Sequence, residues 1–256
     1  MSIANELDGI LADLESLNLE EIQKASLLKR KDRKYIFSTH LLPDILKLVS
    51  RDYRVLEING KRSQFYRTYY YDTPELEMYH KHHRGFSSRH KVRIREYTAS
   101  DLRFLEVKRK NAKGVTNKKR VQTSGMDHSD LTKESLFLES NSPYHSEGVA
   151  FALENQFNRI TLVSHNQSER VTLDHQLKFT GSEEETKMDL PGVCVAEIKY
   201  GGHLSGSMIN KVLRQTKIAP RRFSKYAIGM ALLHPHLKQN RFKAKVRSVH
   251  QINSKY

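Results

Sequence analysis

Charged and apolar residues alternate one by one along several segments of this chain. In residues 90–98, HKVRIREYT, the cations at positions 91, 93 and 95 alternate with Val92 and Ile94. In residues 103–111, RFLEVKRKN, three charged positions again alternate with apolar ones. Successive side chains of a β-strand point to opposite faces of the sheet, so each segment is predicted to be a strand with one charged face. A helix is disfavoured because its period is 3.6 residues.

The same pattern recurs often enough to build most of a fold. Further strands are predicted at 117–123, 157–163, 168–179 and 193–201, with tyrosine-rich strands near the Asn59-Gly60 turn signal. Helices are predicted at 39–50, 205–217 and 222–233, with a short one after Pro74. We therefore expect an α+β protein with a large, mainly antiparallel sheet.

The chain carries far more positive than negative charge. Its 256 residues include 44 Lys and Arg against 29 Asp and Glu, a formal net charge of +15. Such an excess favours an anionic partner: nucleic acid, an acidic membrane surface or a phosphate-rich ligand. The single cysteine, Cys194, excludes an internal disulfide framework and a cysteine-rich zinc module. The chain contains no P-loop and no Ser-His-Asp or Cys-His hydrolase arrangement.

The two ends differ from the body. Residues 1–28 place Leu and Ile at helical spacing among acids, which predicts a helical segment packed on the body. Residues 238–256 contain six Lys or Arg and no acid, which predicts a basic, flexible tail. One domain is expected between them, at 29–237. No apolar stretch is long enough to cross a bilayer, and the N-terminus resembles no signal peptide, so we expect a cytoplasmic protein.

The charged strand faces allow two interpretations. In an ordinary two-layer protein they would face water. Enough strands are present, however, to close a barrel, and cationic faces turned inward would be costly to bury without a polyanion. Such a barrel would be a phosphate-binding tunnel in which Arg grips phosphate oxygens bidentately. Glu106 and Glu197, each two residues before a lysine, would supply oxygen ligands for Mn²⁺ or Mg²⁺.

The motifs, taken in order, resemble the VTC domain, the polyphosphate polymerase branch of the triphosphate tunnel (CYTH-like) superfamily. The strongest matches are YYYDTPELEMY at 69–79, KVRIREY at 91–97 and RFSKYAIGM at 222–230. The resemblance implies an eight-stranded antiparallel β-barrel tunnel with flanking helices. It also implies a divalent metal, Mn²⁺ or Mg²⁺, and transfer of the γ-phosphate of ATP to a growing polyphosphate chain.

The resemblance assigns roles to individual residues. The catalytic cations would be Arg93, Arg95, Lys108, Arg170 and Lys225. Further phosphate contacts would come from Lys34, Arg89, Lys91, Lys110, Lys119, Arg159 and Lys199. Glu197 would be the metal ligand, with Glu106 as the second candidate.

Two other functions stay open. One is a metal-dependent tripolyphosphatase or nucleoside triphosphatase, or an inactive polyphosphate-binding module, on the same fold. The E-x-E-x-K motif of the hydrolase branch is replaced here by KDRKYIF, which argues against that branch. The other is a nucleic-acid-binding protein, the weakest candidate, because no signature of a nucleic-acid-binding module is present. Eukaryotic polymerases of this kind carry membrane helices, so any membrane contact is expected through a separate partner protein.

Metal binding by the histidines of the HKHH segment, residues 80–83, is also considered. A surface or phosphate-facing position is the favoured interpretation of these side chains.

Overall fold

The computed structural model describes residues 3–24, 31–123, 131–183 and 185–256. Its α-helices are α1 (Ile3–Ala12), α2 (Leu19–Lys24), α3 (Leu42–Val49), α4 (Glu77–Arg84), α5 (Ser135–Asn141), α6 (Met208–Gln215), α7 (Lys225–Leu233) and α8 (Lys243–Asn253). Its strands are β1 (Ser16–Leu17), β2 (Lys31–Ser38), β3 (Tyr53–Leu56), β4 (Ser63–Asp72), β5 (Arg89–Tyr97), β6 (Leu102–Lys110), β7 (Thr116–Gln122), β8 (Ala150–Ser164), β9 (Glu169–Gly181), β10 (Lys187–Leu190) and β11 (Val193–Tyr200). The predicted α+β class is confirmed.

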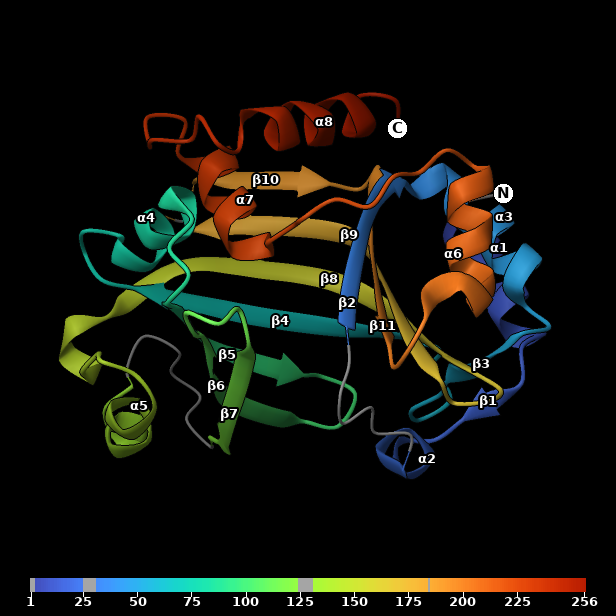
Figure 1. The fold of residues 1–256 in the computed structure, drawn as a ribbon, viewed down its shortest axis with the longest axis horizontal. Coiled ribbons are helices and arrows are strands. Elements are labelled where there is room, and N and C mark those ends of the chain that lie inside the picture. Colours follow the sequence, from blue (N-terminus) through green and yellow to red (C-terminus); the bar gives the residue numbers. More distant parts are fainter. Residues whose placement is uncertain (1–2, 25–30, 124–130, 184) are drawn as a thin grey trace.

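One sheet contains the eleven strands of the described residues. Eight of them follow the order β2-β11-β9-β8-β4-β5-β6-β7, and every neighbouring pair on this path is antiparallel. The sheet curves, so that the end strand β2 crosses in front of β9 and β8, and the other end strand, β7, lies in front of β5 and β6 (Figure 1). The eight antiparallel strands agree with the prediction. Within the described ranges β2 and β7 do not pair, so the sheet is open along this seam rather than a closed barrel.

The apolar side chains of the alternating strands lie on one face, called here the outer face. Val92 and Ile94 of β5 pack there with apolar residues of β4 and β6 and with Leu138 of α5. Strands β2, β8, β9 and β11 bury their apolar side chains on the same face against α1, α3 and α6. Burial of these residues fixes the opposite, inner face as the one that receives the alternating charged side chains.

Helix α7 packs on the inner face. Its residues from Tyr226 to Leu233 are buried against a cluster that includes Leu153, Phe157 and Phe179. Gly229 permits this close approach, because a Cβ at that position would lie 2.7 Å from a ring carbon of Phe179 and 2.8 Å from a methyl carbon of Leu153. Helix α7 therefore covers the apolar part of the inner face and brings its N-terminus beside the charged part.

Both terminal segments pack on the body. Helix α1 joins the outer face through Leu7, Ile10 and Leu11, as the helical spacing predicts. The segment 238–256, expected to be a flexible tail, instead contains α8, whose Val249 is buried. In the described part of the chain, no helix combines the length and the apolar character that a membrane crossing requires.

Candidate phosphate-binding site

Charged residues from seven strands share the inner face. Residues directly opposite one another on paired strands point to the same face, so the register identifies them. The opposite pairs made of charged residues on this face are Lys34–Glu197, Asp32–Lys199, Lys199–Arg170, Asp174–Arg159, Arg93–Glu106, Lys91–Lys108, Arg89–Lys110, Glu106–Arg120 and Lys108–Lys118. Arg95 lies on the same face, where its Nε donates to Thr68 Oγ1 at 3.3 Å. Apart from Lys119, described below, the predicted site residues are brought onto this one surface or to its edge.

Asp174 on β9 is bound by two cations from different elements. Nε and Nη2 of Arg159 donate to its two carboxylate oxygens at 2.6 and 2.8 Å. Lys225, at the start of α7, forms a second ion pair with Asp174. Its Nζ also lies 3.2 Å from the centroid of the Phe157 ring. One carboxylate thus faces two cations, which leaves the cluster with a net positive charge that a phosphate could neutralise.

The titration of this cluster centres on Lys225. Burial lowers the pKa of Lys225 to about 7; the attraction of Asp174 opposes this shift and the repulsion of Arg159 adds to it. Burial raises the pKa of Asp174, but the two cations outweigh that effect and hold the pKa well below its usual range. Because an arginine stays protonated in proteins, Lys225 is the member of the cluster that gains or loses a proton near neutral pH.

Glu106 on β6 has a side chain with 0% exposure, held between Arg93 and Lys118. Arg93 donates from Nε at 2.8 Å and from Nη2 at 2.5 Å, both to Oε2. Lys118 Nζ donates to Oε1 at 2.7 Å. Burial raises the pKa of Glu106, but Arg93, Arg95 and Lys118 together hold the pKa well below its usual range. The ionised carboxylate therefore fixes the orientation of the Arg93 guanidinium.

The lysine that β7 contributes is Lys118, one position before the predicted Lys119. Lys118 lies opposite Lys108 on the inner face, whereas Lys119 lies opposite Val107 on the outer face. The prediction that Lys119 belongs to the site is therefore wrong, and Lys118 takes its place. The sequence contains a signal for this: Lys119 is two residues before Val121, which packs with the outer-face cluster, and residues two apart on a strand share a face.

Glu197 on β11 also lies between two lysines. Lys34 Nζ is 2.8 Å from one of its oxygens, and Lys199 Nζ is 2.9 Å from the other. Burial raises the pKa of Glu197, but Lys199 and Lys34 outweigh it, and the pKa lies well below its usual range. Burial lowers the pKa of Lys199 to about 8, against the attraction of Glu197. The Glu197 side chain is 17% exposed, unlike that of Glu106.

Carboxylate oxygens are suitable ligands for Mn²⁺ and Mg²⁺. Within the described residues, however, no group of three or more His, Cys, Asp or Glu side chains is placed to hold a metal ion. A divalent ion at Glu197 would therefore need phosphate oxygens of the substrate to complete its coordination. Glu106 is the poorer ligand, because its side chain is 0% exposed whereas that of Glu197 is 17% exposed. The residues fit a metal that is shared between Glu197 and a bound phosphate.

A hollow of about 240 Å³ lies where β5, β6 and β7 meet, and its charged lining is entirely cationic. It is lined by Arg89, Lys91, Lys108, Lys110, Gly114 and Thr116. Burial and the repulsion of neighbouring cations lower the pKa of both Lys91 and Lys108. The cost of holding these cations together would be relieved by a bound anion. The hollow is thus a candidate site for an anion on the inner face.

Lys91 also links the hollow to the cluster at Asp174. Its Nζ donates to Ser224 Oγ at 2.7 Å, and the same oxygen caps α7 by accepting from the Ala227 N–H. Sequence reasoning did not assign Ser224 or Asp174 to the site. The alternation of Asp174 with Arg170 along β9 is a signal for Asp174, whereas Ser224 reaches Lys91 only through tertiary packing.

Arg170 lies opposite Lys199 and contacts the N-terminal segment. Its Nη2 donates to the backbone carbonyl of Ile22 in α2 at 2.7 Å. Arg170, predicted to be catalytic, therefore lies at the edge of the inner face, next to α2.

A curved antiparallel sheet with a cationic inner face and embedded carboxylates has the charge that suits a polyanionic ligand. The chain belongs to the VTC domain family, whose model matches residues 29–234. Among curated proteins, none matches the sequence.

Similar solved structures include three with low sequence identity. A protein from Vibrio parahaemolyticus, proposed to be an adenylate cyclase, is 14% identical over 77% of this chain and 95% of its own, with a TM-score of 0.47. The PH1819 protein from Pyrococcus horikoshii is 15% identical over 78% and 97%, with a TM-score of 0.46. A proposed adenylyl cyclase from Hippeastrum, described as having a dominant triphosphatase activity, is 13% identical over 78% and 96%, with a TM-score of 0.48. These likenesses are too distant to transfer a function.

Proposed function

We propose that this protein is a polyphosphate polymerase that transfers the γ-phosphate of ATP to the end of an inorganic polyphosphate chain. The observation that carries the proposal is the convergence of cations from seven strands and from α7 on one inner face. Three ionised carboxylates, Glu106, Asp174 and Glu197, lie among them. This density of charge suits a linear chain of phosphates better than a single phosphate group. Membership of the VTC domain family supports the same substrate class.

The reaction needs no nucleophile from the protein. A terminal phosphate oxygen of the acceptor chain attacks the γ-phosphorus of ATP, a new phosphoanhydride bond forms, and the bond to the β,γ-bridging oxygen breaks as ADP leaves. Charge spreads over the equatorial oxygens in the transition state. Arg93, whose guanidinium Glu106 already orients, would donate to these oxygens with little reorganisation. Holding both phosphate chains along one face supplies proximity.

The other cations divide the work by position. Lys91 and Lys108 line the cationic hollow and would hold one end of the phosphate chain. Arg159 and Lys225 would hold the phosphates nearest α7. A divalent ion bound by Glu197 and phosphate oxygens would supply further neutralisation of charge. Lys34 and Lys199, which pair with Glu197 here, would then be released to contact phosphate.

The proposal is tested by incubating the purified protein with ATP and Mn²⁺ or Mg²⁺ and resolving the products by gel electrophoresis. Long-chain polyphosphate and ADP are expected. Arg93→Ala and Glu197→Ala should each abolish synthesis, while Lys119→Ala, on the outer face of the same sheet, should retain it. Release of orthophosphate alone would contradict polymerisation and identify the protein as a triphosphatase on the same fold.

A further inference from the structure

Helix α8 is held at both of its ends by contacts with the body of the protein. Its preceding residue Phe242 is buried, with its ring 5.8 Å from that of His82 and 5.3 Å from that of His83, both on α4. At the other end of α8, the side chain of Asn253 accepts from the Gly192 N–H at 3.0 Å. Figure 1 shows α8 running along β10, with its first residues on the side of α4. The cations of α8 therefore have defined positions.

Two cations in the C-terminal part of the chain, Arg222 and Lys245, lie near the cationic hollow. Lys245 Nζ lies 5.6 Å from the centroid of the Phe242 ring, which places it beside α4. Burial lowers the pKa of Lys245, and the positive charge of Arg222 lowers it further. Arg222 has the same effect, after burial, on the pKa of Arg89, which lines the hollow. Arg222 is two residues before Ser224, whose Oγ accepts from Lys91 of the hollow at 2.7 Å, so the backbone at Arg222 lies beside the hollow.

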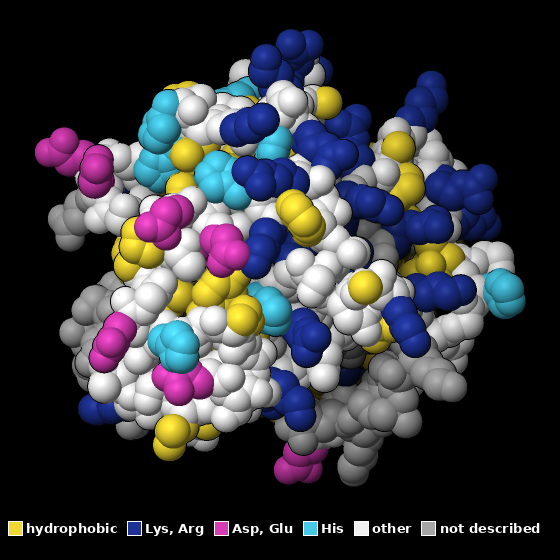
Figure 2. All heavy atoms as spheres, turned by 60° about the vertical axis from the view of Figure 1, so that its left-hand side comes forward, with side chains coloured by type: hydrophobic (Ala, Val, Ile, Leu, Met, Phe, Trp, Pro, Cys, Tyr) yellow, Lys and Arg dark blue, Asp and Glu magenta, His cyan; other side chains and the backbone are white. Residues whose placement is uncertain are grey.

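The pKa of His82 is lowered by several of the same cations. Burial lowers its pKa to about 2, and Lys91, Arg89, Lys245 and Lys110 each contribute to the lowering. These four cations come from β5, β6 and α8, and three of them line the hollow. Within residues 31–123 and 185–256, none of Arg89, Lys91, Lys110, Arg222 and Lys245 forms an ion pair with a carboxylate. Figure 2 shows Lys and Arg gathered on one part of this side of the molecule.

We propose that Arg222 and Lys245 form a second phosphate-binding segment, which binds the part of a linear polyphosphate that extends beyond the inner face. The inference rests on the proposed function. A row of cations that starts at Arg89 in the hollow and continues to α8 fits an extended polyanion, because a single phosphate could contact only one end of it. This segment would help to retain a growing chain between additions, since each further contact slows dissociation without touching the reacting atoms.

The test compares tripolyphosphate, which fits the inner face alone, with long-chain polyphosphate. Binding of both is measured by isothermal titration calorimetry at several salt concentrations, using the full chain. The Arg222→Glu/Lys245→Glu double variant should bind long-chain polyphosphate about ten-fold more weakly, with a shallower salt dependence, and tripolyphosphate within about two-fold of the wild type. If the glutamate variant fails to fold, the Arg222→Gln/Lys245→Gln variant is measured in the same way.

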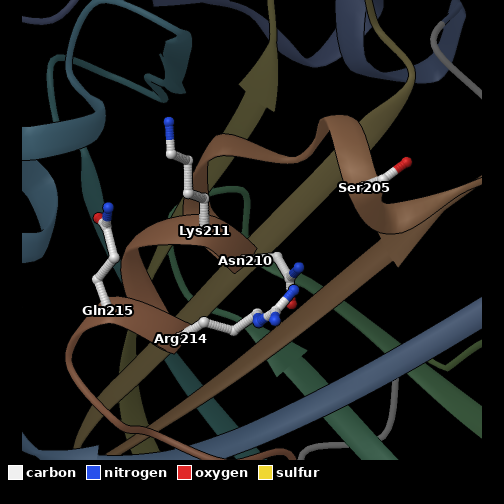
Figure 3. A pocket seen from close by; sticks show the side chains of 5 residues that line it. All are labelled: Ser205, Asn210, Lys211, Arg214 and Gln215. Atoms are coloured by element: carbon white, nitrogen blue, oxygen red, sulfur yellow. The ribbon is translucent and has the colours of Figure 1, made fainter.

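A matched control removes two cations elsewhere. Lys211 and Arg214 of α6 line a separate surface hollow of about 350 Å³ with Ser205, Asn210 and Gln215 (Figure 3). The Lys211→Glu/Arg214→Glu variant has the same net charge as the test variant and should bind long chains like the wild type. Equal loss in both double variants would overturn the inference, as would unchanged long-chain binding in the test variant.

Two further outcomes separate the inference from the function on which it rests. If single-stranded RNA displaces the long chain from the wild type but not from the test variant, the second segment binds nucleic acid and the inference is overturned. If the wild type prefers long chains through Arg222 and Lys245 but makes none from ATP, the binding segment stands and the proposed polymerase function fails.

Discussion

Lys225 on α7 and Asp174 on β9, 51 residues apart in the chain, form an ion pair against the ring of Phe157. Burial lowers the pKa of Lys225 to about 7, against the attraction of Asp174. A bound polyphosphate would favour the charged form and raise this pKa. Binding of tripolyphosphate at pH 8 should therefore be accompanied by net proton uptake at Lys225.

This proton uptake is measured by calorimetry in buffers that differ in ionisation enthalpy. Affinity should fall as the pH rises above 7, because the free protein must first bind the proton. In Lys225→Arg the uptake from this position should disappear, since a guanidinium stays charged. Uptake that remains in the variant would come from Lys199, whose pKa is about 8. Equal uptake in wild type and variant would contradict the role given to Lys225.

Glu106 and Glu197 should respond differently to the same substitution. Glu106→Gln breaks the pair between Arg93 and the fully buried Glu106 and should lower the free energy of unfolding by about 3 kcal/mol. Glu197→Gln affects a carboxylate that is 17% exposed and should lower the free energy of unfolding by less than Glu106→Gln does. Urea unfolding measures both values.

Metal binding should show the opposite ranking of the two glutamates. With tripolyphosphate bound, Glu197→Gln should lose most of its Mn²⁺ affinity, whereas folded Glu106→Gln should keep it. Calorimetric titration with Mn²⁺ distinguishes them. A Glu106→Gln variant that loses Mn²⁺ while Glu197→Gln retains it would reverse the assignment of the metal ligand.

The neighbours Lys118 and Lys119 provide a test of the strand register. Lys118 bonds to Glu106 on the inner face, and Lys119 lies on the outer face. Lys118→Ala should weaken tripolyphosphate binding about five-fold, because it removes a partly exposed cation from the site. Lys119→Ala should change it less than about two-fold. The same titration of both variants decides the matter, and a larger loss in Lys119→Ala would show that β7 is displaced by one residue.

Gly229 should be sensitive to a single added methyl group. A Cβ there would lie within 2.9 Å of three carbons of Phe179 and Leu153, so Gly229→Ala should destabilise the protein by about 1–3 kcal/mol. The displacement of α7 should also weaken tripolyphosphate binding through Lys225. Gly206→Ala is the matched control, because nothing lies within 4 Å of its added Cβ. Urea unfolding should show a change below about 0.5 kcal/mol for the control.

Local pattern was sufficient to predict much of the sheet. The alternation in 90–98 and 103–111 corresponds to β5 and β6, with Val92 and Ile94 on the apolar face as expected. The segment NKKRVQT was harder, because adjacent lysines put positive charge on both faces of the strand. Val121 packs on the outer face, and the resulting register against β6 places Lys118, rather than Lys119, on the inner face.

The sequence by itself determined which residues alternate, which ends are acidic or basic, and which family the motifs resemble. These are local properties, since strand period and helical spacing depend on neighbouring residues. Only the tertiary structure decided that β2 and β7 stay unpaired within the described residues, that Lys225 reaches Asp174, and that the segment 238–256 contains α8 packed on the body. Such contacts depend on sheet curvature and on the packing of α7 and Phe242 against distant strands and helices. No periodicity within one segment encodes them.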